Sequence, residues 1–132
     1  MSRLSGKTHT DAGSPQPKLV KFFGRFETDG ANNPPATSIK GRGIVSVVKE
    51  AGAGLYTITL DRSLAEILHI SPQLWAATSG TQEVRLIQGT VDPGDFDTRA
   101  TFQLETHSVA GTEANLDGPL VSFELVGHVL GT

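Results

Sequence analysis

Apolar side chains recur at every second position along most of the chain, which is typical of strands with one buried face. The pattern is clearest at Leu55–Leu60, where Tyr56, Ile58 and Leu60 point one way and two threonines point the other. The same spacing predicts strands at Leu19–Phe26, Gly43–Lys49, Gln73–Ala77, Glu83–Gln88, Arg99–His107 and Leu120–Leu130. Clusters of Gly, Pro, Asn and Asp separate these segments, so we expect about seven strands.

The segment Gly43–Lys49 differs from the others because it is apolar on both faces. Such a pattern indicates a central strand, or one that is covered on its second side. The Ala-Gly-Ala-Gly sequence at 51–54 follows it directly, and its glycines allow the positive φ angles of a tight turn. We therefore predict a hairpin that joins this strand to Leu55–Leu60.

One short helix is predicted at Ser63–Leu68. Ser63 and Glu66 have the spacing of a capping box, in which each side chain bonds the backbone amide of the other residue. Three apolar residues follow the serine at helical spacing, and Pro72 ends the pattern after about two turns. We assign Glu66 this capping role rather than that of a catalytic acid.

These elements predict an all-β fold: an antiparallel β-sandwich or a jelly-roll-like barrel of about seven strands with one short helix. The length of 132 residues suits one domain, which we place at residues 18–132. Residues 1–17 are rich in Gly, Ser, Thr and Pro, with Leu4 as the only bulky aliphatic side chain besides Met1. Because so little apolar surface cannot offset the conformational entropy of folding, we expect a flexible N-terminal arm.

The composition excludes several classes of protein and site. The chain has no cysteine, which excludes disulfides, thiolate zinc sites and cysteine nucleophiles. No apolar run approaches the roughly 20 residues of a membrane-spanning helix, and residues 1–11 lack the apolar stretch of a secretory signal. No Ser lies in a G-x-S-x-G motif. We expect no enzyme activity, no cofactor and no membrane partner.

Charge is distributed unevenly along the chain. Residues 1–49 hold eight basic and three acidic side chains, whereas residues 50–132 hold three basic and eleven acidic ones, for a net charge of −3. This asymmetry indicates either a dipolar surface that docks head-to-tail or onto a charged partner, or halves that interleave on folding. The basic third also contains Phe22, Phe23 and Phe26, but the acidic total and their strand positions favour a core role over nucleic-acid binding.

Two groups of residues are candidates for binding a metal ion. Asp92, Asp95 and Asp97 lie in a Gly/Pro turn where their oxygens could converge on calcium, although the spacing is not that of an EF-hand and Asp is also a common turn residue. His107 and His128 occupy outward positions on consecutive predicted strands, where they would be neighbours. Two imidazoles lack a third ligand for zinc, so we assign no metal.

A set of strand and turn signatures spans residues 18–132 and resembles a group of small virion structural proteins of tailed bacteriophages. The matching segments are Lys21–Phe26, Asn32–Ala36, Gly41–Val47, Gly52–Leu60, Leu64–Leu68 and Val121–Val126. The resemblance implies a non-enzymatic capsid decoration (cement) protein that forms a homotrimer on the capsid surface of the virion and binds the major capsid protein. The basic N-terminal extension is not part of the shared pattern.

We expect the partner contacts to come from the N-terminal arm together with five nearby cations. These partner-binding candidates are Arg3, Lys7, Lys18, Lys21 and Arg25. An arm that becomes ordered on docking could clamp neighbouring shell subunits, and three arms on one trimer would act together. Two alternatives stay open: a tail, baseplate or fibre-attachment module of a virion, and a carbohydrate-binding sandwich that uses Trp75 and Tyr56 as its exposed aromatics.

Overall fold

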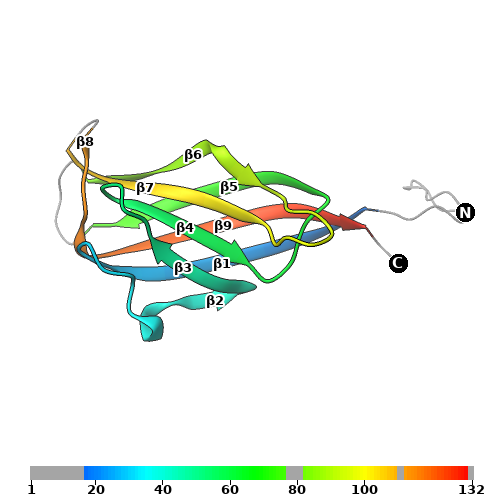
Figure 1. The fold of residues 1–132 in the computed structure, drawn as a ribbon, viewed down its shortest axis with the longest axis horizontal. Coiled ribbons are helices and arrows are strands. Elements are labelled where there is room, and N and C mark those ends of the chain that lie inside the picture. Colours follow the sequence, from blue (N-terminus) through cyan, green and yellow to red (C-terminus); the bar gives the residue numbers. More distant parts are fainter. Residues whose placement is uncertain (1–16, 77–81, 110–111, 131–132) are drawn as a thin grey trace, which may run out of the picture.

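The computed structural model describes residues 17–76, 82–109 and 112–130, most of which lie in strands (Figure 1). The predicted N-terminal arm lies almost entirely outside the described residues. In chain order the elements are β1 (Pro17–Asp29), the 3₁₀ turn η1 (Ala36–Ser38), β2 (Lys40–Arg42), β3 (Ile44–Lys49), β4 (Leu55–Leu60), β5 (Glu66–Trp75), β6 (Glu83–Asp92), β7 (Thr101–Val109), β8 (Thr112–Glu113) and β9 (Asp117–Leu130).

The strands form two antiparallel sheets. Sheet A has the order β2-β1-β9-β5, and sheet B has the order β3-β4-β7-β6 with the short β8 paired to β7. Each strand pair is antiparallel, and the sheets do not close into a barrel. The prediction of an all-β antiparallel sandwich is confirmed, and the barrel alternative is wrong.

The core lies between the inner faces of the two sheets. Inward positions alternate with outward ones as predicted, so that Phe22 and Phe26 of β1 face Tyr56 and Ile58 of β4 across the interior. The rings of Phe26 and Tyr56 lie 5.0 Å apart. The remaining fully or nearly fully buried apolar side chains are Val47, Leu60, Leu64, Ala100, Phe102, Leu104, Leu116, Val121, Phe123 and Leu125.

The predicted helix at Ser63–Leu68 is wrong, because this segment leads into β5, an edge strand of sheet A. A two-turn helix has little stability of its own, whereas strand pairing with β9 supplies backbone hydrogen bonds over the whole length of β5. A register shift between Ile67 and His69 keeps the apolar positions of this strand directed inward. Pro72 does not end the element, because an edge strand tolerates a missing amide donor.

The interpretation of β3 as a central or doubly covered strand is also wrong. β3 lies at the edge of sheet B and pairs there with β4. Val45 and Val48 are 47% and 41% exposed. The predicted β3–β4 hairpin is confirmed, and its last glycine, Gly54, has a φ of +67°. A side chain there would also meet the carbonyl oxygens of Thr106 and Ala114 at 2.5 Å.

Candidate functional site

The outer face of sheet A gathers apolar and basic side chains from β2, β1 and β5, and β9 lies between the last two strands. Antiparallel register places Phe23 of β1 between Arg42 and Glu124, and places Arg25 between Lys40 and Ser122. Paired residues share one face of a sheet, so these side chains form two adjacent rows. The docking face, as we name it, consists of Leu19, Lys21, Phe23, Arg25, Lys40, Arg42 and Trp75.

An open groove of about 600 Å³ crosses the middle of the docking face, and its lining includes Phe23, Arg25, Lys40, His69 and Trp75. Phe23 and Trp75 are 47% and 46% exposed. The Trp75 indole N–H donates to Ser122 Oγ at 3.0 Å, and the Arg25 guanidinium carbon lies 5.4 Å from the ring centroid. The groove therefore has a fixed aromatic wall with a cation resting against it.

Three of the four basic groups of the docking face form no ion pair within the described residues, although Glu124 also lines the groove. Lys21 Nζ lies 3.4 Å from Glu124 Oε2, which joins the basic β1 to the acidic β9. No carboxylate among the described residues lies within ion-pair distance of Arg25, Lys40 or Arg42. Folding thus interleaves the charged halves of the chain only in part, and the face keeps a positive potential that favours an anionic partner.

The five predicted partner-binding cations fall into three groups. Lys21 and Arg25 lie together on the docking face. Lys18 is exposed, but it lies two residues before the inward Val20 in β1 and therefore on the opposite strand face from Lys21. Arg3 and Lys7 lie outside the described residues. Lys40 and Arg42 were missed, because only the pairing of the short β2 with β1 brings them onto this face.

The acidic turn between β6 and β7 uses its carboxylates to shape its own backbone. Asp92 Oδ1 accepts from the amide of Gly94 at 2.9 Å, and Asp95 Oδ1 accepts from the amides of Asp97 and Thr98 at 2.8 and 3.1 Å. These hydrogen bonds, together with the Thr98 hydroxyl, lower the pKa of Asp95. Within the described residues the three predicted calcium ligands do not form a metal-binding group; Asp92 and Asp95 cap the turn instead.

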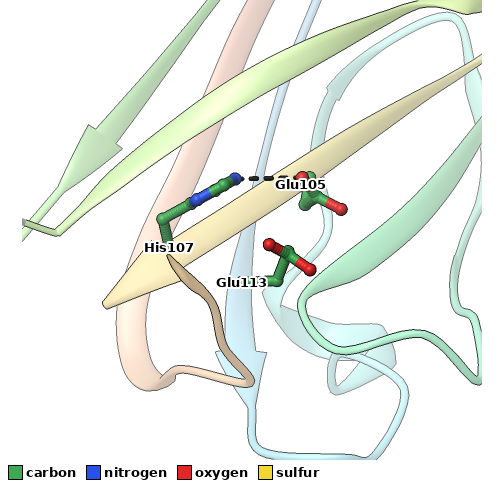
Figure 2. Close-up of side chains that lie close together, drawn as sticks. All are labelled: Glu105, His107 and Glu113. Carbon is green, nitrogen blue, oxygen red and sulfur yellow. Dashed lines mark hydrogen bonds and ion pairs between the residues drawn. The ribbon is translucent and has the colours of Figure 1, made fainter. Parts of the chain in front are cut away.

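A different cluster of ligand-type side chains lies at the opposite end of the sandwich (Figure 2). Glu105, His107 and Glu113 place one ligand atom each within 4.8 Å of the others, and His107 Nε2 lies 3.0 Å from Glu105 Oε1. The His107 side chain is 3% exposed, and its Nδ1 atom has no hydrogen-bond partner among the described residues. An imidazole with two carboxylates is a donor set that zinc-like divalent ions accept.

Sequence reasoning missed this cluster and misplaced its histidine. Glu105 and His107 share a strand face, but Glu113 reaches them through the pairing of β8 with β7, in a segment predicted as a loop. The expectation that His107 and His128 are neighbours is wrong: His107 lies in sheet B, buried on the strand face that it shares with Glu105, whereas His128 lies in sheet A, 3.4 Å from Glu66. That contact also replaces the predicted capping role of Glu66, since Ser63–Leu68 is not helical.

Tyr56 is a core residue rather than an exposed platform for sugars. Its side chain is fully buried and its hydroxyl has no hydrogen-bond partner in the described part of the chain. Burial, with smaller contributions from Asp29 and Asp117, raises the pKa of Tyr56 to about 12. Of the two aromatic residues proposed for carbohydrate stacking, only Trp75 reaches the surface.

In comparisons with known proteins, no protein-family model, curated protein sequence or solved structure matches the chain. In the part of the chain that the structure describes, no helix has the length and apolar character needed to cross a membrane. The interpretation of function therefore depends on the surfaces described above and on the resemblance drawn from the strand and turn signatures.

Proposed function

We propose that this protein is a non-enzymatic structural protein that acts by binding other proteins, and specifically that it decorates the outer surface of a phage head. The observation that carries the proposal is the docking face, where Phe23 and Trp75 are exposed beside Arg25, Lys40 and Arg42, which form no ion pair within the described residues. Aromatic and arginine side chains are enriched at protein interfaces and supply much of their binding energy. The resemblance to virion decoration proteins supplies the identity of the partner, the major capsid protein.

In this proposal the shell contact lies at the end of the docking face where β1 begins. Leu19 is 63% exposed, and with Lys21 and Arg42 it lines a second hollow at the edge of the docking face, which Asp61 also lines. Residues 1–16 join β1 at Pro17, next to this hollow. In this proposal the basic arm and these two cations engage an acidic region of the shell together, which makes attachment multivalent when three copies associate.

The proposal is tested by sedimentation with undecorated heads assembled from the cognate major capsid protein. We expect wild-type protein to pellet with the heads and the double variant Lys21→Glu/Arg42→Glu to bind at least about 10-fold more weakly, because reversing rim charges creates repulsion. The matched control is Lys49→Glu/Arg85→Glu, which makes the same change of charge on sheet B, away from the docking face. Its binding should stay within about twofold of wild type.

Removal of residues 1–16 gives a second variant for the same sedimentation experiment. The truncated chain keeps every strand and should fold, with the same circular dichroism spectrum, but should no longer pellet with heads. Unchanged pelleting of both the truncated chain and Lys21→Glu/Arg42→Glu would refute the proposed shell contact. Pelleting with isolated tails instead of heads would assign the protein to a tail or baseplate.

Carbohydrate binding is a second candidate function, because Trp75 shares the groove with the polar side chains of Ser71 and Gln73. Sugar rings stack on exposed aromatic faces, but here the Arg25 guanidinium already rests against the Trp75 ring. This contact makes the groove better suited to a protein surface. A glycan array probed with wild-type protein and with Trp75→Ala distinguishes the two functions, since only a sugar-binding groove gives signals that the substitution abolishes.

A further inference from the structure

Phe96 is the most exposed large apolar side chain in the described part of the protein, with 100% of its surface accessible. It lies in the β6–β7 turn, at the end of the sandwich where β1 begins (Figure 1). A fully exposed phenylalanine contributes nothing to the core, and large exposed apolar groups commonly mark interaction sites. Phe96 therefore has the exposure of an anchor residue for a binding partner.

The turn that carries Phe96 is held in one conformation by its own hydrogen bonds. Asp95 bonds the backbone on the far side of Phe96 through Asp97 and Thr98, and the Thr98 hydroxyl adds a contact at 3.0 Å. At the base of the turn, the Leu64 amide donates to the Pro93 carbonyl at 2.7 Å. An anchor on a preorganised turn loses little conformational entropy on binding, which favours its use in recognition.

The charge around Phe96 is opposite to the charge of the groove on the docking face. The turn from Asp92 to Arg99 holds three carboxylates and one cation. None of these carboxylates forms an ion pair within the described residues. The groove holds one carboxylate, Glu124, and two cations, Arg25 and Lys40, that form no ion pair within the described residues, beside the apolar surfaces of Phe23 and Trp75. Each surface offers what the other lacks.

We propose that the groove of one copy binds the Phe96 turn of a second copy of this chain. Phe96 enters the groove between Phe23 and Trp75, and the turn carboxylates pair with Arg25 and Lys40. This inference deepens the proposed function, on which it rests, by naming the partner of the central part of the docking face. The shell contact stays with Lys21, Arg42 and the arm.

The placement of the two surfaces determines the kind of assembly. The turn lies at an end of the sandwich and the groove lies on the flank of sheet A, so the contact joins two different surfaces and is heterologous. Heterologous contacts generate closed rings or open filaments, and a ring of three uses every turn and every groove. One turn in one groove buries less area than a stable pairwise interface needs, so assembly should depend strongly on concentration.

The first test is sedimentation velocity of the full chain over a concentration series, at low and at high salt. We expect concentration-dependent association that weakens as salt screens the turn and groove charges. Phe96→Ala and Trp75→Ala should each weaken association at least about 10-fold. Val48→Ala is the matched control, because it truncates an exposed apolar side chain on the opposite sheet, and it should change association less than about twofold.

A charge exchange tests whether turn and groove meet directly. Asp97→Lys changes a turn carboxylate whose side chain makes no hydrogen bond in the described residues, and Lys40→Asp changes the groove. Each variant alone should associate about 10-fold more weakly than wild type. The double variant Asp97→Lys/Lys40→Asp should recover association, because in every contact the introduced lysine of one copy pairs with the introduced aspartate of the next.

Three results overturn the proposal: a chain that stays monomeric over the whole series, Phe96→Ala that associates like wild type, or a double variant that associates no better than the single variants. Because Phe96 is fully exposed, its substitution should leave the thermal unfolding transition unchanged, which excludes misfolding as the cause. A monomer that still pellets with heads refutes this inference alone. A chain that associates through Phe96 but ignores heads and tails refutes the proposed function alone.

Discussion

The outer faces of the two sheets differ in how they use their polar side chains. On sheet B the Thr57 hydroxyl donates to Glu50 at 2.6 Å, the Gln103 amide group donates to Thr57 at 3.0 Å, and the Thr90 hydroxyl accepts from the Gln103 backbone at 2.9 Å. On sheet A, Phe23 and Trp75 are exposed beside cations without acidic partners. The polar side chains on sheet B thus bond one another, whereas the aromatic rings and cations on sheet A remain accessible to a partner.

The inner faces of the two sheets, by contrast, are alike and say little about function. Both contribute aromatic and aliphatic side chains to one core, as the contact between Phe102 of β7 and Phe123 of β9 illustrates with ring centroids 5.2 Å apart. A face whose polar groups already bond each other would lose those bonds, or have to desolvate them, on binding a partner. Within the described residues, Arg25, Lys40 and Arg42 of sheet A form no ion pair that binding would break, so we propose this face, together with the Phe96 turn, as the binding surface of the protein.

The largest expected effect compares two phenylalanines of β1. Phe26 is fully buried and Phe23 lies on the docking face. Phe26→Ala should lower the free energy of unfolding by about 3–5 kcal/mol, because it leaves a cavity, whereas Phe23→Ala should lower it by less than about 1 kcal/mol. Urea denaturation measures both. A large loss for Phe23→Ala would mean that this residue stabilises the fold and is not free for a partner.

A second prediction concerns the unpaired hydroxyl of Tyr56 between the sheets. Tyr56→Phe removes a buried polar group without a partner, so the variant should be about 1 kcal/mol more stable at neutral pH. The raised pKa of Tyr56, to about 12, also gives a pH dependence. Since the folded state favours the neutral phenol, this contribution is complete below pH 10 and is lost as pH rises toward 12.

Thermal melts of wild type and Tyr56→Phe between neutral pH and about pH 12 measure this effect. The wild type should lose stability more steeply than the variant above the ordinary tyrosine pKa of 10.0. Parallel alkaline curves would show that another group controls the transition. Such a result would leave the comparison of the outer faces intact but would contradict the account of the core.

A third prediction compares one hydrogen bond on each outer face. Thr57→Val removes a hydroxyl that bonds both Glu50 and Gln103, and should cost about 1 kcal/mol of stability. Ser122→Ala removes the single acceptor of the exposed Trp75 indole and should cost less than about 0.5 kcal/mol. Chemical denaturation of both variants measures the difference. Equal costs would contradict the view that sheet B bonds itself more tightly.

The smallest effect on stability should come from the ion pair between Lys21 and Glu124. Both side chains are about half exposed, so Lys21→Met should change the free energy of unfolding by less than about 0.5 kcal/mol. The same substitution should measurably weaken pelleting with heads. A change in stability without any change in binding would reverse our assignment of Lys21 to the shell contact.

Most of the inner face of the sandwich could be predicted from local alternation, and the errors occurred where long-range pairing decided the outcome. Tyr56, Ile58 and Leu60 face inward as their spacing indicates. The segment from Ser63 to Leu68 has a helical capping signal, but pairing of β5 with β9 overrides it. β3 is apolar on both faces and nevertheless lies at an edge, because hydrophobicity does not specify the number of neighbouring strands.

The docking face likewise contains some residues that the sequence could identify and others that only strand pairing brings together. Lys21 and Arg25 could be selected from the sequence as a basic pair on one strand face, because a separation of four residues conserves side-chain direction in a strand. Lys40 and Trp75 join them only through the pairing of β2 with β1 and of β5 with β9, over separations that no local pattern reports.

The amino-acid order by itself determined which side chains turn toward the core, since alternation is a property of each strand. Tertiary structure alone decided which outward side chains became neighbours, because strand order and register are set by packing over the whole domain. That is why Glu105 and His107 meet Glu113, and why the cations of β1 and β2 share a face with Trp75.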